Sequence, residues 1–224
     1  EQNSGISPEL VIVNSCTVTA KADNKSRQAA RKLRREYPDA RIIVTGCGAE
    51  LVEKEQNTTD SAVDLWLPNP EKSRIISHII RLFTGEEPVA EMCLSEEMST
   101  DDFQEDATAA FPFKSRAFLK IQEGCDNFCS YCIVPHVRGR ERSRKHVEVV
   151  REFNNLLTKG FREIVLTGVN VCAYNSDGMD LAMLLTELTT IDGDFRIRLS
   201  STEPQPNNRP LLDVMASIPK ICRF

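Results

Sequence analysis

The sequence has no apolar stretch long enough to cross a bilayer, because its longest apolar runs are short and strand-like. It lacks an initiator methionine and a basic-then-apolar leader, so we expect a fragment, truncated at both ends, whose start says little about targeting. Eight cysteines in 224 residues are too few for a disulfide-dense secreted scaffold. These features favour a protein without membrane partners in a reducing compartment, the cytoplasm.

One segment lacks bases altogether. Residues 86–113 hold nine acidic residues and no Lys or Arg, and outside them 28 bases face 24 acids. The segment also lacks apolar periodicity and has prolines at 88 and 112. We therefore expect residues 86–114 to form an acidic linker between two mildly basic domains.

The first of these domains, residues 1–85, is predicted to be a small parallel α/β sandwich. Short runs rich in β-branched and aromatic residues predict strands at 10–13, 41–45 and 63–67. Apolar residues at three-and-four spacing predict helices at 19–37 and from Pro70 to Gly85. A strand, helix, strand order favours a parallel sheet.

Two cysteines follow these predicted strands. Cys16 lies in the loop after the first strand, and Cys47 lies in the exit loop Gly46-Cys47-Gly48 after the second. The carboxyl ends of parallel strands share one sheet edge, so we expect the two cysteines to be neighbours. They are either a pair of ligands or two small buried hydrophobic side chains.

Residues 115–224 are predicted to form a second domain of repeated strand and helix units. The pattern predicts strands at 117–122, 162–167 and 195–199, each followed by a loop and a helix, with loops at 123–143, 168–179 and 200–209 and helices at 145–159, 180–190 and 210–217. Near-continuous apolar strands in this order indicate a parallel sheet or a barrel. Catalytic groups are then expected in the loops at the carboxyl ends of the strands.

The first of these loops holds three thiols, Cys125, Cys129 and Cys132, at C-x3-C-x2-C spacing. Three thiolates can converge on one metal centre and leave one coordination position open. An iron-sulfur cluster held in this way keeps one iron free for a substrate. Zinc is the alternative, because His136 could complete a closed Cys3His tetrahedron. Disulfides or inert thiols are a third reading.

Basic residues follow the thiols and also line the first predicted helix. Arg138, Arg140, Arg142, Arg144 and Lys145 form a run beside the thiol loop. Lys25 to Arg35 carry six bases on one face of the helix. Both runs suit RNA phosphate, and both are also compatible with solvated surface.

Five ordered blocks of this sequence resemble the tRNA methylthiotransferases, and most closely the branch that modifies N6-threonylcarbamoyladenosine. The blocks are Asn14–Thr19, Val44–Cys47, Leu119–Cys125, Glu163–Asn170 and Arg196–Pro204. The thiol triplet, the strand before it and Tyr131 beside the last thiol resemble the signature of radical S-adenosylmethionine enzymes. The resemblance implies an N-terminal methylthiotransferase domain without its first strand, and a partial radical-SAM (β/α) barrel.

The resemblance also implies two 4Fe-4S clusters and S-adenosylmethionine as cofactors. Cys125, Cys129 and Cys132 would hold the radical cluster. Cys16 and Cys47 would hold an auxiliary cluster with a third cysteine that lies upstream of Cys16 in the family. Contacts to S-adenosylmethionine are expected from five residues: Tyr131, Gly168, Asn170, Ser200 and Glu203.

The implied reaction is insertion of a methylthio group at C2 of the hypermodified adenosine at position 37, in the anticodon arm of tRNA. It would need an electron donor such as flavodoxin or ferredoxin. Three alternatives stay open: an isopentenyladenosine tRNA substrate, a ribosomal protein substrate, and a structural zinc module without catalysis. The fragment itself is expected to be inactive.

Overall fold

The computed structural model describes residues 7–55, 60–86, 115–203 and 208–223. The chain divides into two compact units. The first unit contains the described residues up to 86 together with Cys129–Arg138, and the second contains residues 115–128 and those from 139 onward. Almost all of the predicted linker, with Cys93, lies outside the described residues.

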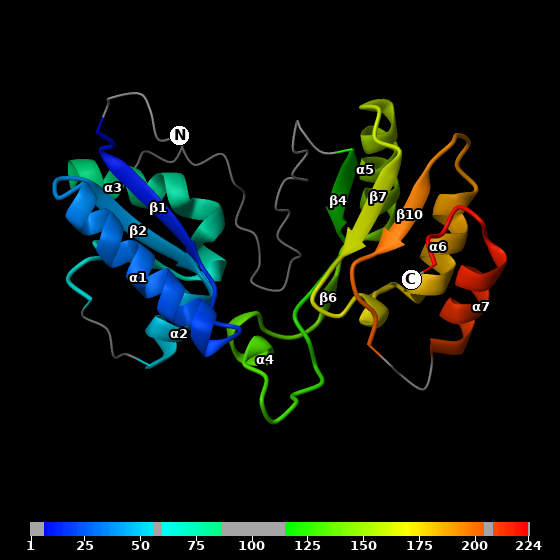
Figure 1. The fold of residues 1–224 in the computed structure, drawn as a ribbon, viewed down its shortest axis with the longest axis horizontal. Helices are drawn as coiled ribbons and strands as arrows, with labels where there is room; N and C mark the ends of the chain where they lie inside the picture. The colour runs from blue at the N-terminus through cyan, green and yellow to red at the C-terminus, as the bar shows by residue number, and fades with distance from the viewer. Residues whose placement is uncertain (1–6, 56–59, 87–114, 204–207, 224) are drawn as a thin grey trace. The chain divides into compact units, whose positions relative to one another are not determined.

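The first unit is built on a three-stranded parallel sheet, as predicted. Its strands are β1 (Leu10–Ser15), β2 (Arg41–Gly46) and β3 (Leu65–Leu67), and their order in the sheet is β1-β2-β3. Helix α1 (Ala20–Glu36) begins where the Thr19 side chain accepts a hydrogen bond from the amide of Ala22. It packs on β1 and β2 through Ala30, which is 1% exposed (Figure 1).

The prediction of an exit loop at Gly46-Cys47-Gly48 is wrong, because helix α2 (Cys47–Glu55) begins directly at Cys47. Gly46 makes this sharp change of direction possible. Its φ is +92°, and a Cβ there would lie 2.5 Å from the carbonyl oxygen of Ser15. The sequence then continues through the 3₁₀ helix η1 (Asn69–Arg74) into α3 (Ile75–Thr84), which ends at Gly85 as predicted.

The second unit has its own parallel sheet, with β4 (Arg116–Lys120), β7 (Glu163–Thr167) and β10 (Arg196–Leu199) in the order β10-β7-β4. Helices α5 (His146–Thr158), α6 (Leu181–Thr189) and α7 (Arg209–Ser217) lie along it (Figure 1). The fully buried side chains of Leu119, Phe153 and Leu166 belong to the core that joins sheet and helices. The prediction of an α/β fold with parallel sheets is confirmed.

The predicted loops contain short elements that periodicity did not indicate. The thiol loop is bracketed by β5 (Gln122–Glu123) and β6 (Arg142–Ser143), which pair antiparallel, and it contains α4 (Val134–Val137). The loop after β7 contains the 3₁₀ helix η3 (Val171–Ala173) and the hairpin of β8 (Asn175–Ser176) and β9 (Met179–Asp180). Within the described part of the chain, no helix has the length and apolar character needed to cross a membrane.

Candidate functional site

The first thiol of the triplet is held in place by its backbone. Gly124, the residue before Cys125, has a φ of +72°, and a Cβ on it would lie 1.9 Å from the carbonyl oxygen of Arg140. The amide of Cys125 donates a hydrogen bond to the carbonyl oxygen of Gly139 at 3.2 Å. Cys125 is therefore buried, at 9% exposure, against the segment that returns from the loop.

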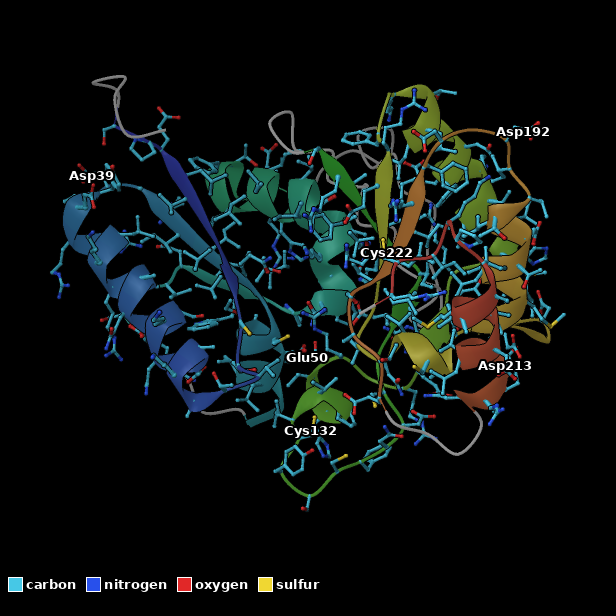
Figure 2. All side chains as sticks on the ribbon, turned by 45° about the vertical axis from the view of Figure 1, so that its right-hand side comes forward. Asp39, Glu50, Cys132, Asp192, Asp213 and Cys222 are labelled. Carbon is cyan, nitrogen blue, oxygen red and sulfur yellow. The ribbon has the colours of Figure 1, made fainter. Side chains whose placement is uncertain are left out.

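The other two thiols belong to the first unit. The amide of Cys132 donates to the carbonyl oxygen of Cys129 at 2.9 Å, so one turn of backbone separates them. Cys129 is exposed. Cys132 is half-buried and lies just before α4 (Figure 2). Tyr131 between them is 90% exposed. Both thiols are free of disulfides and, like Cys125, retain the chemistry of iron-sulfur ligands.

The segment around α4 is attached to the first unit by two contacts of Asn69. The amide of Asn69 donates to Glu50 Oε2 at 3.3 Å, and its side chain donates to the carbonyl oxygen of Val137 at 3.1 Å. His136 is exposed on this helix. Among the described residues, no three His, Cys, Asp or Glu side chains are gathered closely enough to hold a metal ion.

Cys16 and Cys47 directly follow two residues that pair across the first sheet, Ser15 and Gly46. Their side chains differ, because Cys16 is exposed while Cys47 is 1% exposed. Arg138, at the end of α4, donates from Nε to Cys47 Sγ at 3.0 Å. Sequence reasoning assigned Arg138 to RNA phosphate and missed this contact with a thiol distant in the chain.

In the second unit, Gln122 connects the thiol loop with the loop after β7. Its side chain is fully buried. Nε2 donates to the carbonyl oxygens of Glu123 and Gly124 at 3.0 and 2.9 Å, and Oε1 accepts from the amide of Asn170 at 2.7 Å. Sequence reasoning also missed this residue. The signal in the sequence that could have identified it was a polar amide side chain directly after an apolar strand.

Gly168 and Asn170, two predicted cofactor residues, lie in that second loop. A Cβ on Gly168 would lie 2.9 Å from Gln122 Cβ, so glycine permits the close approach of Gln122. Asn170 is 3% exposed, and its Nδ2 and Oδ1 atoms are both buried without a hydrogen-bond partner. Leaving such an amide unsatisfied costs about 1–3 kcal/mol for each group.

This unpaired amide is the observation that tests whether the residues fit S-adenosylmethionine. The methionine end of that molecule carries an ammonium donor and a carboxylate acceptor, and Asn170 offers one acceptor and one donor. The chemistry of the Asn170 amide therefore fits the methionine end of the cofactor, and its assignment to the cofactor stays a prediction. Ser200 and Glu203, after β10, are exposed, and their assignment to the cofactor stays a prediction.

The basic run after the thiols serves several structural contacts. Arg140 is an exposed side chain whose Nε lies 3.1 Å from Asp126 Oδ1 and whose guanidinium lies 5.3 Å from the centroid of the Phe128 ring. Phe128 has a φ of 45°, which a non-glycine residue rarely adopts. Arg140 thus contacts the thiol loop at the strained Phe128 and at Asp126, two residues before it.

Arg144 lies in the interior, contrary to the prediction that it contacts RNA. It is 6% exposed, and its Nε lies 3.8 Å from Glu148 Oε2. Its carbonyl oxygen accepts a hydrogen bond from the hydroxyl of Tyr174 at 2.8 Å. Burial raises the pKa of Tyr174 to about 12, so the hydroxyl remains a donor at neutral pH. Arg142 is half-buried, and Lys145 is exposed.

Comparisons with known proteins first define the class of protein to which this chain belongs. Residues 119–222 match the radical SAM superfamily, and residues 2–68 match the uncharacterized protein family UPF0004. The structure is similar to that of TsrM, a radical S-adenosylmethionine methyltransferase from Kitasatospora setae, with a TM-score of 0.58 and 16% identity over 95% of this chain and 47% of that chain. At this identity the likeness concerns the fold alone, which is a partial radical SAM fold.

The relatives then define the family. The chain is 36% identical to the threonylcarbamoyladenosine tRNA methylthiotransferase MtaB of Chlamydia pneumoniae, over 98% of this chain and 48% of the relative. It is 37% identical to the MtaB protein of Bacillus subtilis, over 95% of this chain and 47% of the relative. The chain belongs to the radical SAM methylthiotransferase family, and it spans about half the length of these relatives.

A third relative carries a different substrate in its name. The chain is 36% identical to the tRNA-2-methylthio-N(6)-dimethylallyladenosine synthase of Carboxydothermus hydrogenoformans, over 96% of this chain and 50% of the relative. Overall identity therefore does not separate the two adenosine substrates. Membership of the radical SAM superfamily implies S-adenosylmethionine and a 4Fe-4S cluster.

Proposed function

We propose that the protein to which this chain belongs is a tRNA methylthiotransferase that converts N6-threonylcarbamoyladenosine at position 37 to its 2-methylthio derivative. One observation carries the proposal: a loop with three free thiols leaves a parallel sheet and is tied through Gln122 to Asn170, whose buried amide has no partner. The names of the MtaB relatives support the substrate. The proposed domains are 1–85, a linker at 86–114, and a radical SAM core at 115–224.

Cys125, Cys129 and Cys132 would hold the 4Fe-4S cluster in this proposal. When bound, such a cluster would supply one electron for the reductive cleavage of S-adenosylmethionine into methionine and a carbon-centred radical. The chain's own contribution is to bind and orient. Asn170 would bind the methionine end through its unpaired amide, and the backbone of Gly124 would keep Cys125 at a constant position.

Cys16 and Cys47 would ligate the auxiliary cluster, with a third cysteine outside this sequence. They follow paired residues at one sheet edge, which supports a shared ligand. The hydrogen bond from Arg138 Nε to Cys47 Sγ resembles the outer contacts that orient metal ligands. Arg138 would then act on the auxiliary site rather than on RNA.

The tRNA substrate is expected to contact exposed bases of α1 and the thiol loop. Within the helix, Arg27, Arg31 and Arg34 pair with carboxylates, whereas Lys25, Lys32 and Arg35 are exposed. Exposed bases are the groups that exchange counterions for phosphates. A flavodoxin or ferredoxin as electron donor, and the cytoplasm as location, complete the proposal.

The test combines metal analysis with tRNA nucleosides. The protein is purified anaerobically, and a strain without it is complemented with wild type, Cys125→Ala, Cys47→Ala and Cys222→Ala. We expect bound iron and sulfide, restoration of 2-methylthio-N6-threonylcarbamoyladenosine by wild type, and its loss, by more than about 100-fold, in the first two variants, because each removes a ligand. Cleavage of S-adenosylmethionine by purified protein should fail only in Cys125→Ala.

Cys222→Ala is the control, because Cys222 is a further free thiol, half-buried, that follows Ile221 next to the second sheet and lies in no predicted site (Figure 2). It should restore the nucleoside. Stoichiometric zinc without iron would refute the proposal, as would an unchanged nucleoside profile accompanied by an altered ribosomal protein. Restoration by Cys47→Ala would refute the auxiliary site.

A further inference from the structure

The amide group at the end of the Gln122 side chain forms hydrogen bonds with two different loops. Its amide nitrogen donates to the carbonyl oxygen of Gly124, one residue before Cys125. Its amide oxygen accepts from the backbone amide of Asn170, 48 positions along the chain. The distances are 2.9 and 2.7 Å, and the side chain is fully buried. These are buried hydrogen bonds of good geometry, so each loop restrains the other.

The loop after β7 approaches this side chain closely. Gly168, two residues before Asn170, presses on it so closely that a Cβ would lie 2.9 Å from Gln122 Oε1. On the other side, a Cβ on Gly124 would overlap the backbone of Arg140. Glycine at position 168 permits the close approach to Gln122, and glycine at position 124 permits the close approach of the thiol loop to Arg140.

The unpaired amide of Asn170 gives this arrangement a chemical meaning. The Gln122 bond satisfies the backbone amide of Asn170 and leaves Nδ2 and Oδ1 buried without partners. Buried polar groups in folded proteins are normally hydrogen-bonded, so an unsatisfied side chain on an anchored backbone is a candidate to meet a ligand. Cys125, three residues after Gln122, is proposed to ligate the iron that meets the same ligand.

We propose that Gln122 is a positioning residue that holds the Asn170 amide and the Cys125 backbone at the spacing needed by one S-adenosylmethionine. This inference rests on the proposed function, because it assumes that Cys125 and Asn170 serve the same cofactor. Gln122 itself does not touch the cofactor. A misplacement of about 1 Å between two such groups can cost on the order of 100-fold in rate.

The experiment uses the anaerobically reconstituted full-length protein and two variants. Gln122→Met has a similar length but loses all three side-chain hydrogen bonds, and Gln122→Glu keeps the acceptor for Asn170 while losing the donor to Glu123 and Gly124. We measure iron content, the dissociation constant of S-adenosylmethionine by equilibrium dialysis, and the change that it causes in the electron paramagnetic resonance spectrum of the reduced cluster. Thermal unfolding is followed in parallel.

We expect Gln122→Met to keep its iron, to bind S-adenosylmethionine at least about tenfold more weakly, and to lose most of the spectral change. Gln122→Glu should weaken binding less, because the bond to Asn170 survives. Tyr174→Phe is the control for stability, since it also removes a buried hydrogen bond of this unit, to the carbonyl oxygen of Arg144. Its affinity and spectrum should be those of wild type.

Wild-type affinity and spectral change in Gln122→Met would overturn the inference and leave Gln122 as a packing residue. The same result in Gln122→Glu, with Gln122→Met unfolded, would overturn the part of the inference that concerns Gly124. A wild-type protein that holds iron but shows no spectral response to S-adenosylmethionine would overturn the proposed function as well. The two failures are thus distinguishable.

Discussion

At the scale of single residues, two glycines with similar backbones have different consequences. Gly124 and Gly160 have φ values of +72° and +90°. A Cβ on Gly124 would lie 1.9 Å from the carbonyl oxygen of Arg140, whereas a Cβ on Gly160 meets nothing within 4 Å. Both alanine variants therefore carry the strain of a left-handed residue, about 1–2 kcal/mol, and only one adds a backbone clash.

We expect Gly124→Ala to displace the thiol loop and to lose most of its bound iron, because Cys125 follows directly. Gly160→Ala, the matched control, should lower the free energy of unfolding by about 1–2 kcal/mol and keep its iron. Iron analysis and urea unfolding of both variants measure this. Equal iron content in the two variants would show that the clash is relieved without moving the thiol.

At the scale of elements, one carboxylate joins the three strands of the second sheet. Glu163 of β7 lies 2.9 Å from the Arg198 guanidinium of β10 and 3.7 Å from that of Arg116 of β4. The hydrogen bond from Arg198, helped by the charge of Arg116, lowers the pKa of Glu163. Its contribution to stability is therefore present above the ordinary carboxyl pKa and is lost as the pH falls through the lowered value.

We expect Glu163→Gln to lower the free energy of unfolding by about 1 kcal/mol at pH 7, because the arginines are partly exposed and solvent screens the pairs. The loss should shrink toward pH 3, where the wild-type carboxyl also becomes protonated. Asp213→Asn is the control, since the ion pair of Asp213 with Arg209 is exposed and connects residues of a single helix rather than neighbouring strands. A Glu163→Gln effect that stays constant with pH would mean that packing, rather than charge, is lost.

At the scale of the whole molecule, the placement of exposed bases is expected to govern tRNA binding. Lys25 and Lys32 are exposed on α1, and Arg151 and Lys159 are exposed in and after α5. We compare two double variants, each with two of these bases changed to Gln and the same change in net charge. The α1 pair should lower tRNA affinity and reduce the slope of log affinity against log salt by about 1.5–2.

The α5 pair should change the tRNA affinity and the salt slope only by the small amount that any loss of two positive charges from the protein causes. Fluorescence titration of tRNA at several salt concentrations provides the measurement. Arg140 is unsuitable for this comparison, because it also fastens Asp126 and Phe128 in the thiol loop. Equal effects of the two pairs would contradict an RNA surface on α1 and would indicate nonspecific attraction.

The sequence by itself determined most of the regular elements. The predicted helix at 19–37 is Ala20–Glu36, and the predicted strand at 162–167 is Glu163–Thr167. Apolar periodicity and end signals are local, so they survive in a sequence without its fold. Helix α2 was missed because Gly46 and Gly48 indicate a turn, and the short pairing of β5 with β6 has no periodicity of its own.

Only the tertiary structure decided how the site is held together. Gln122 is one polar residue at a strand exit until packing brings it to Asn170, and Arg138 is one base in a run until α4 brings it to Cys47. Arg144 belongs to the same run and is buried. Residue type and spacing were enough to predict the three thiols as candidate metal ligands, because all three lie within one short loop of the sequence. Partners distant in the chain depend on the packing of the whole unit, which no local pattern encodes.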